Sequence, residues 1–192
     1  MIAALFSDAL ADRASATRLE PLLARESDQV DGANLHRLAE ALEGYLAGVP
    51  DAMNALIAMG KQPPYGRSVA FASGQVLLYL VDEDDLFGEA EFGALGLLDD
   101  AYLIHTCVAA CRAFFPGIEQ PHGYTPPDYA TAAAVRALLP AGVPEALDRT
   151  CENLVRVAGA MYSGGGPGAA AEDGPTFSLR VEEAVAALGA GS

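Results

Sequence analysis

The sequence contains no lysine and no arginine from residue 68 to residue 111. Its acidic residues there are confined to residues 82–100, so segments 68–81 and 101–111 carry almost no formal charge. A helix that is apolar on all sides has to be buried, and both segments are too short to span a bilayer. The sequence therefore predicts two buried helices, joined by a strongly acidic connection that faces water.

Helical spacing of apolar residues continues in the rest of the chain, between glycine and proline breaks. Leu35, Leu38 and Leu42 recur at intervals of three and four, which predicts a helix that Asp31 or Asn34 can cap. The predicted fold is all-α: a single-domain helical bundle of about seven or eight helices with a central apolar helical hairpin.

Prolines mark the starts of further predicted helices. One runs from Pro50 to Met59, and another begins at Thr125, which can cap it while Pro126 occupies the first turn. A longer helix over residues 143–162 has apolar residues on one face and charged residues on the other. We expect this last helix to lie on the surface of the bundle.

The chain divides into three predicted parts. Residues 1–162 form the helical domain. Residues 163–176 are rich in glycine and lack large apolar side chains, which is typical of a flexible linker. Residues 177–192 are predicted to form a short C-terminal helix and tail.

Charge and composition exclude some classes of function. Lys and Arg total 11 against 26 Asp and Glu, a formal net charge of -15, which repels nucleic acid. No stretch is long and apolar enough for a membrane span. The start of the chain lacks the basic region of a signal peptide, and three cysteines are an odd number, so we expect reduced thiols and a cytoplasmic location. The many alanines allow close helix packing within one chain or in a homo-oligomer.

A motif lies within the region of low charge. It consists of Tyr79, Asp85, Leu86, Gly96, Leu98, Asp99 and Asp100. This pattern resembles the YkvA-like family of small bacterial helical domains, over about residues 68–112. The chain departs from the family pattern by lacking prolines near Glu83 and Gly88, and by one extra residue between Leu86 and Gly96. The resemblance implies an α-helical fold and no established reaction.

The aspartates of this motif have two interpretations. Asp85 and either Asp99 or Asp100 can cap helix N-termini. Alternatively, the three carboxylates hold a divalent cation, because oxygen-rich sites suit Mg²⁺, Ca²⁺ or Mn²⁺. An EF-hand is excluded: if Asp82 were its first position, Gly93 would stand in place of the final acidic ligand.

Other candidate sites are weaker. Cys107 and Cys111 lie near His105 and could form a soft-metal site, but buried cysteines more often serve as small apolar residues. Glu119 and His122 have the spacing of di-iron ligands, yet the prolines around them predict a loop. The sequence matches no catalytic template, so we predict no catalytic residue.

These observations favour a non-catalytic interaction or regulatory module, and leave the existence of an enzymatic activity open. The module would engage a basic protein partner through its C-terminal helix or through an acidic face, formed by Asp82, Glu83, Asp84, Glu89 and Glu91. The alternative is a divalent-cation-dependent enzyme or cation-binding regulator that uses Asp85, Asp99 and Asp100. A pocket for a small molecule between helices would leave no recognisable sequence signature.

Overall fold

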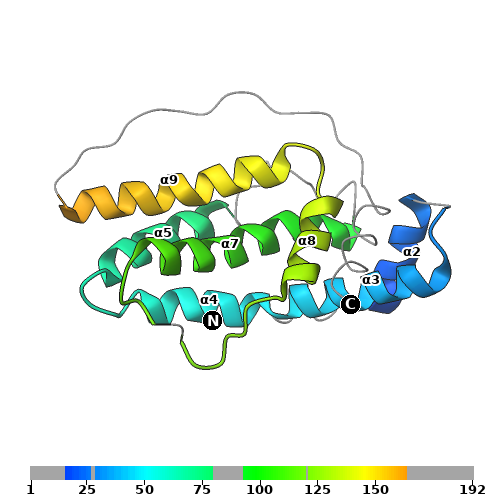
Figure 1. The fold of residues 1–192 in the computed structure, drawn as a ribbon, viewed down its shortest axis with the longest axis horizontal. Helices are drawn as coiled ribbons and strands as arrows, with labels where there is room; N and C mark the ends of the chain where they lie inside the picture. Colours follow the sequence, from blue (N-terminus) through cyan, green and yellow to red (C-terminus); the bar gives the residue numbers. More distant parts are fainter. Residues whose placement is uncertain (1–15, 27–28, 80–92, 120, 164–192) are drawn as a thin grey trace.

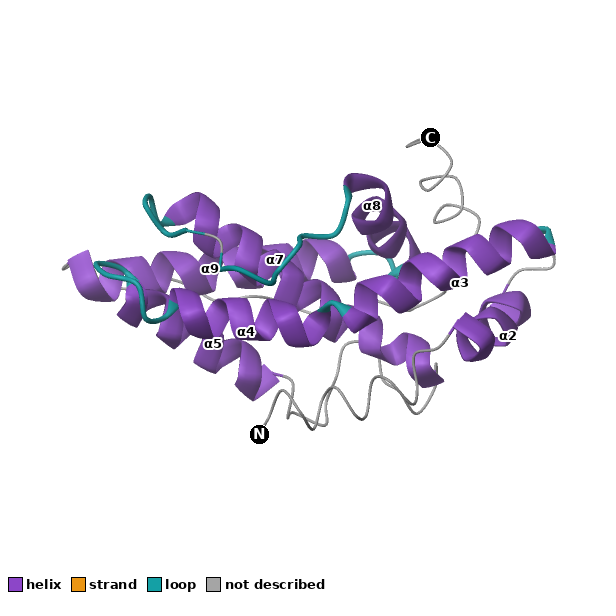
Figure 2. Ribbon diagram, turned by 90° about the horizontal axis from the view of Figure 1, so that it is seen from below, coloured by secondary structure: helices purple, strands orange, loops and turns teal. Residues whose placement is uncertain are grey.

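The structure is a computed structural model that describes residues 16–26, 29–79, 93–119 and 121–163 (Figure 1). Within these ranges every regular element is a helix, and Figure 2 shows no strand in them. The elements are α2 (Ala16–Glu26), α3 (Gly32–Ala47), α4 (Val49–Met59), α5 (Gly66–Tyr79), the short 3-10 helix η1 (Gly93–Leu97), α7 (Leu98–Phe114), α8 (Tyr129–Leu138) and α9 (Val143–Ser163). The predicted all-α class is confirmed.

Helix α7 lies at the centre of the described bundle. Figure 1 shows α9 along one side of α5 and α7, with α3 and α4 in a row along the other side. Helix α8 packs against α3 and α7, and α2 packs against α3. No helix in the described ranges is long and apolar enough to cross a bilayer.

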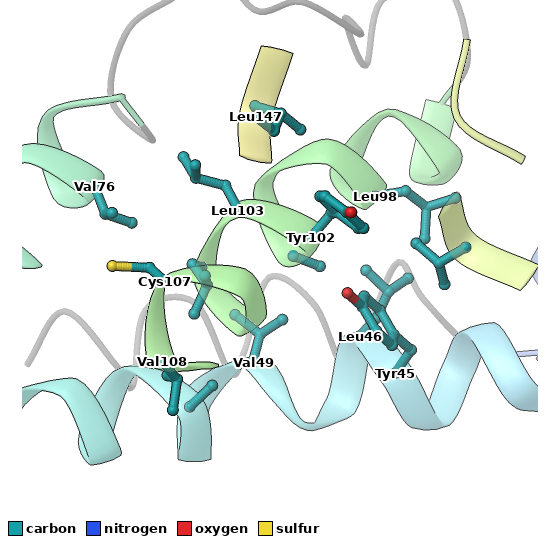
Figure 3. Packing of buried hydrophobic residues seen from close by; sticks show 14 of the residues in the cluster. Tyr45, Leu46, Val49, Val76, Leu98, Tyr102, Leu103, Cys107, Val108 and Leu147 are labelled. Atoms are coloured by element: carbon teal, nitrogen blue, oxygen red, sulfur yellow. The ribbon is translucent and has the colours of Figure 1, made fainter. Parts of the chain in front are cut away.

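The burial predicted for residues 101–111 is largely confirmed in α7. The buried residues of this helix point in all directions and include Tyr102, Leu103, His105, Cys107, Val108 and Cys111. Figure 3 shows Leu103 between Val76 of α5 and Leu147 of α9, and Val49 of α4 on the opposite side of α7. Because α7 has neighbours on nearly every side, it needs no polar face over most of its length.

Burial on all sides is wrong for residues 68–79, the described part of the predicted helix 68–81. Helix α5 buries Val69, Ala72 and Val76, but Leu78 is 61% exposed. The reason is its position at the side of the bundle, where α9 and α4 cover it and one face is left to solvent. Of the predicted acidic connection, the residues up to Glu91 lie outside the described residues, whereas Asp99 and Asp100 lie in the first turn of α7. Asp99 is fully buried, so the prediction that the acidic residues face water is wrong at this position.

Helix caps confirm one prediction and correct another. Asp31 caps α3, accepting a hydrogen bond from the Asn34 backbone N–H at 3.0 Å. Thr125 does not cap α8: the cap is Asp128, which accepts from the Thr131 N–H at 2.9 Å. Proline disfavours helical geometry in the residue before it, so Pro126 and Pro127 keep the chain extended until Asp128.

The predicted capping by Asp99 or Asp100 is also wrong. The N-cap of α7 is Leu97, which makes no side-chain capping bond, and both aspartates lie in the first turn. The chain enters α7 directly from η1 and is already helical at Leu97, so no extended capping residue precedes the helix. The carboxylates still lie at the end of α7 where the helix dipole favours negative charge.

Candidate functional site

Two hollows border α7. The first, which we name the tyrosine pocket, has a volume of about 390 Å³ and lies between α3, α7, α8 and the segment that leads into α8. Its polar side chains are Tyr45, Tyr102, His105, Thr106, Arg112, Tyr124, Tyr129, Arg136 and Asp148. A concave site with apolar walls and a few converging polar groups is typical of a binding pocket.

His105 forms the buried end of the tyrosine pocket. Its Nε2 lies 3.2 Å from the backbone oxygen of Tyr45, and its Nδ1 lies 2.9 Å from the hydroxyl of Tyr124. A carbonyl oxygen only accepts hydrogen bonds, so Nε2 must carry the proton and Nδ1 must accept the proton of Tyr124. Burial lowers the pKa of His105, which keeps the imidazole neutral.

A second network closes the side of the pocket formed by α8 and α9. The Tyr102 hydroxyl donates to Asp148 at 2.9 Å. Arg136 donates to both Asp148 and Tyr102, and its other terminal nitrogen donates to Glu145 at 2.8 Å. These contacts tie α7, α8 and α9 together through one guanidinium, as its fork of donors allows.

Three tyrosine hydroxyls converge on the pocket. Burial raises the pKa of Tyr45, and also raises the pKa of Tyr102 and of Tyr124 to about 12. Figure 3 shows the Tyr45 hydroxyl pointing from α3 towards α7. All three phenols are therefore neutral at physiological pH and act as hydrogen-bonding groups, not as phenolate nucleophiles.

The second hollow, which we name the alanine groove, has a volume of about 620 Å³ and lies between α7 and α9. Small side chains line its α7 side, next to the ring of Phe114, which is 51% exposed. The α9 side adds Val155, with Glu152 and Arg156. The lining from α7 is Thr106, Ala109, Ala110, Ala113 and Phe114.

All three cysteines meet beneath the alanine groove. Cys107 and Cys111 of α7 and Cys151 of α9 are free thiols and are fully buried. Hydrogen bonding to Cys107, together with burial, raises the pKa of Cys111 and of Cys151. His105 turns away from them to Tyr45 and Tyr124, which does not favour the soft-metal alternative, and the burial of Cys107 and Cys111 agrees with the preferred interpretation as small apolar residues.

The predicted cation ligands fall only partly within the described residues. Asp99 is fully buried and accepts a hydrogen bond from the Tyr79 hydroxyl at 3.3 Å, and Asp100 is next to it in the first turn of α7. Asp85 lies outside the described residues, as do all the members of the predicted acidic face: Asp82, Glu83, Asp84, Glu89 and Glu91. Within the described ranges, no three His, Cys, Asp or Glu side chains are arranged to hold a metal ion.

The loop predicted around Glu119 and His122 is confirmed. The backbone N–H and C=O of Glu119 both bond to the side-chain amide of Gln62, at 2.9 and 3.1 Å. His122 is exposed. This pair of bonds holds the loop after α7 against the turn between α4 and α5, so the two residues do not act as helical metal ligands.

Sequence reasoning missed the tyrosine pocket. Tyr102 and His105 are three residues apart on one face of an apolar helix, which is a weak signal for a polar cluster. Their partners Tyr45, Tyr124 and Asp148 lie between 19 and 60 residues away in the chain. No spacing rule joins residues at such separations.

The sequence matches no protein-family model, and no curated protein or solved structure is similar to it. The resemblance to the YkvA-like family therefore stays a prediction, and function has to be argued from the geometry of the chain itself.

Proposed function

We propose that this protein is a non-catalytic interaction module, and that its alanine groove receives an amphipathic helix of a protein partner. The supporting observation is the groove itself. Ala109, Ala110 and Ala113 put only methyl groups along one wall, so the backbone of a third helix can approach α7 closely. Phe114, which is 51% exposed, offers apolar contacts to side chains on the inner face of that helix.

Charge favours a basic partner. The chain has a formal net charge of -15, and the charged side chains at the groove are Asp148, which pairs with Arg136, and Glu152 and Arg156. The predicted acidic face, residues 82–91, would add to this field if it joins α5 to α7 as the bend of a hairpin. Such complementarity raises the association rate of a positively charged helix.

The polar groups of the described hollows suit binding. The tyrosines around His105 are neutral phenols, and the three thiols are buried under the groove. A binding module needs a stable surface and no activated nucleophile.

The test is capture from the native host, followed by mapping. Ala113→Arg places a long charged side chain at an exposed position of the groove, and Ala33→Arg makes the same change at an exposed position of α3. A genuine partner is retained by the parent and by Ala33→Arg, lost with Ala113→Arg, and released by salt. Its binding segment, as a synthetic peptide, should become helical on mixing, as judged by circular dichroism. Retention by Ala113→Arg, or binding that is indifferent to salt, contradicts the proposal.

A divalent-cation function is the second candidate, and the fully buried carboxylate of Asp99 is the observation that favours it. Saturable binding of Mn²⁺, Ca²⁺ or Mg²⁺ would raise the melting temperature by mass action. Replacing Asp99 and Asp100 with Asn should remove that rise while the fold is retained. This function is contradicted if none of the three ions changes the melting temperature of the parent protein.

A further inference from the structure

The lining of the tyrosine pocket includes one arginine, Arg112, that pairs with no described carboxylate, in a strongly acidic protein. Two arginines, Arg112 and Arg136, line it, against a single carboxylate, Asp148. The chain as a whole has 26 acidic residues and 11 basic ones. A locally reversed charge in a concave site favours a ligand of the opposite sign.

The two arginines differ in their availability. Arg136 is held by Asp148 and Glu145, so its charge is already compensated. Arg112 is exposed and forms no ion pair with any residue that the structure describes. It lies one and two turns beyond Val108 and His105 on the same face of α7, at the open end of the pocket.

The groups at the buried end of the pocket do not neutralise the charge of Arg112. His105 is neutral because burial lowers its pKa, and its two ring nitrogens are occupied by Tyr45 and Tyr124. Arg112 is therefore the one charge in the described lining of the pocket that a ligand can neutralise without displacing a partner. A planar guanidinium binds a carboxylate through two parallel hydrogen bonds.

The walls of the pocket suit a flat apolar body. Pro126, Pro127 and Tyr129 stand on one side, with Tyr129 89% exposed, and Ala132 lies in the next turn of α8. Val108 and Ala109 of α7 complete the apolar lining. A volume of about 390 Å³ is within the range of roughly 300 to 1,000 Å³ that small-molecule pockets have.

We propose that the tyrosine pocket binds a small aromatic carboxylate, with the carboxylate on Arg112 and the ring between Tyr129, Pro127 and Ala132. The pocket adjoins the alanine groove and shares Thr106, Ala109 and Asp148 with it, but the ligand proposed here does not depend on the partner proposed for the groove. It is a binding site, because no described group near Arg112 is poised to attack or to transfer a proton.

Calorimetric titration of the full chain with 2-naphthoate tests the ligand class. We expect saturable binding that weakens as salt is added. The neutral amide 2-naphthamide, which has the same shape, should bind at least tenfold more weakly, and inorganic phosphate should not bind. Equal binding of acid and amide, binding of phosphate alone, or no saturable binding of the acid would each overturn the proposal.

Binding measurements on variants test whether the ligand occupies the tyrosine pocket. Arg112→Gln should weaken 2-naphthoate binding at least tenfold, whereas Arg149→Gln removes the same charge from an exposed position of α9 outside the pocket and should leave binding unchanged. Ala132→Leu fills the pocket without touching Arg112 and should also abolish binding. Circular dichroism verifies that each variant is folded. Parent-like affinity in folded Arg112→Gln, or equal loss in Arg149→Gln, contradicts the site.

Discussion

His105 shows how one buried residue makes stability depend on pH. The pKa of its imidazole is lowered by burial from the ordinary value of 6.5. Below about pH 6.5 the imidazole is therefore protonated in the unfolded chain but still neutral in the folded chain. The contribution of His105 to stability is complete above that pH and is lost as the pH falls below it.

We predict that urea unfolding of a His36→Gln variant shows lower stability at pH 5.5 than at pH 7.5. The His36 substitution is needed because a hydrogen bond to Glu20 raises the pKa of His36, which acts in the opposite direction. The double variant His36→Gln, His105→Gln should lose most of this difference. If the difference is unchanged without His105, some other group carries it.

Gly66 is required by a close approach of two backbone segments. A Cβ atom at this position would lie 2.6 Å from the backbone oxygen of Gly60. Cβ atoms in real structures essentially never come within 3.0 Å of another heavy atom. The residue thus lets the start of α5 pack on the end of α4.

We predict that Gly66→Ala destabilises the protein by about 1 to 3 kcal/mol, because the clash outweighs the gain in helix propensity. Gly74 on the same helix is the matched control: no atom lies within 4 Å of its added Cβ. Gly74→Ala should stabilise by about 0.5 to 1 kcal/mol, since alanine is the better helix former. Chemical denaturation measures both changes, and a neutral Gly66→Ala would contradict the packing.

At the level of a helix, the start of α8 depends on Asp128. We predict that Asp128→Ala lowers the free energy of unfolding by about 0.5 to 2 kcal/mol through loss of the cap, while Thr125→Ala has little effect. Denaturation of the two variants distinguishes them. A larger loss of unfolding free energy for Thr125→Ala would mean that Thr125 caps the helix, as the sequence predicted.

The position of α8 against α7 and α9 depends on Arg136. Because the side chains of Arg136 and Asp148 are 39% and 32% exposed, solvent weakens their attraction. A double-mutant cycle of Arg136→Gln and Asp148→Asn should still give a coupling of about 1 kcal/mol, since Tyr102 joins the same network. The Arg136 and Glu145 pair, in which the Glu145 side chain is 55% exposed, should give less. Equal coupling in the two cycles would contradict this order.

At the scale of the whole described bundle, the three thiols report on its core. Cys107, Cys111 and Cys151 are fully buried where α7 meets α9. We predict that a thiol reagent such as DTNB labels all three thiols rapidly in denatured protein. In native protein it should label none of them over the same time. Their labelling rate should rise with urea in parallel with unfolding. Fast labelling of one thiol in native protein would mean that the alanine groove opens locally.

Part of the candidate site could be foreseen from the chain. The burial of residues 101–111 in α7 follows from their lack of formal charge, and the Asp31 cap of α3 follows from its place before a helical apolar pattern. The tyrosine pocket could not be foreseen, because Tyr102 and His105 look like any polar residues of a buried helix until Asp148, Tyr124 and Tyr45 are beside them.

The amino-acid sequence by itself determined that this protein is built from helices, since apolar spacing and proline breaks act over a few residues at a time. It also indicated where α3, α4, α5 and α9 begin, but it did not predict α2, and Pro126 and Pro127 delay α8 while η1 runs into α7. Only the tertiary structure decided which polar groups meet and that one face of α5 is exposed. Packing between helices joins residues that are distant in the chain, and no local pattern encodes those contacts.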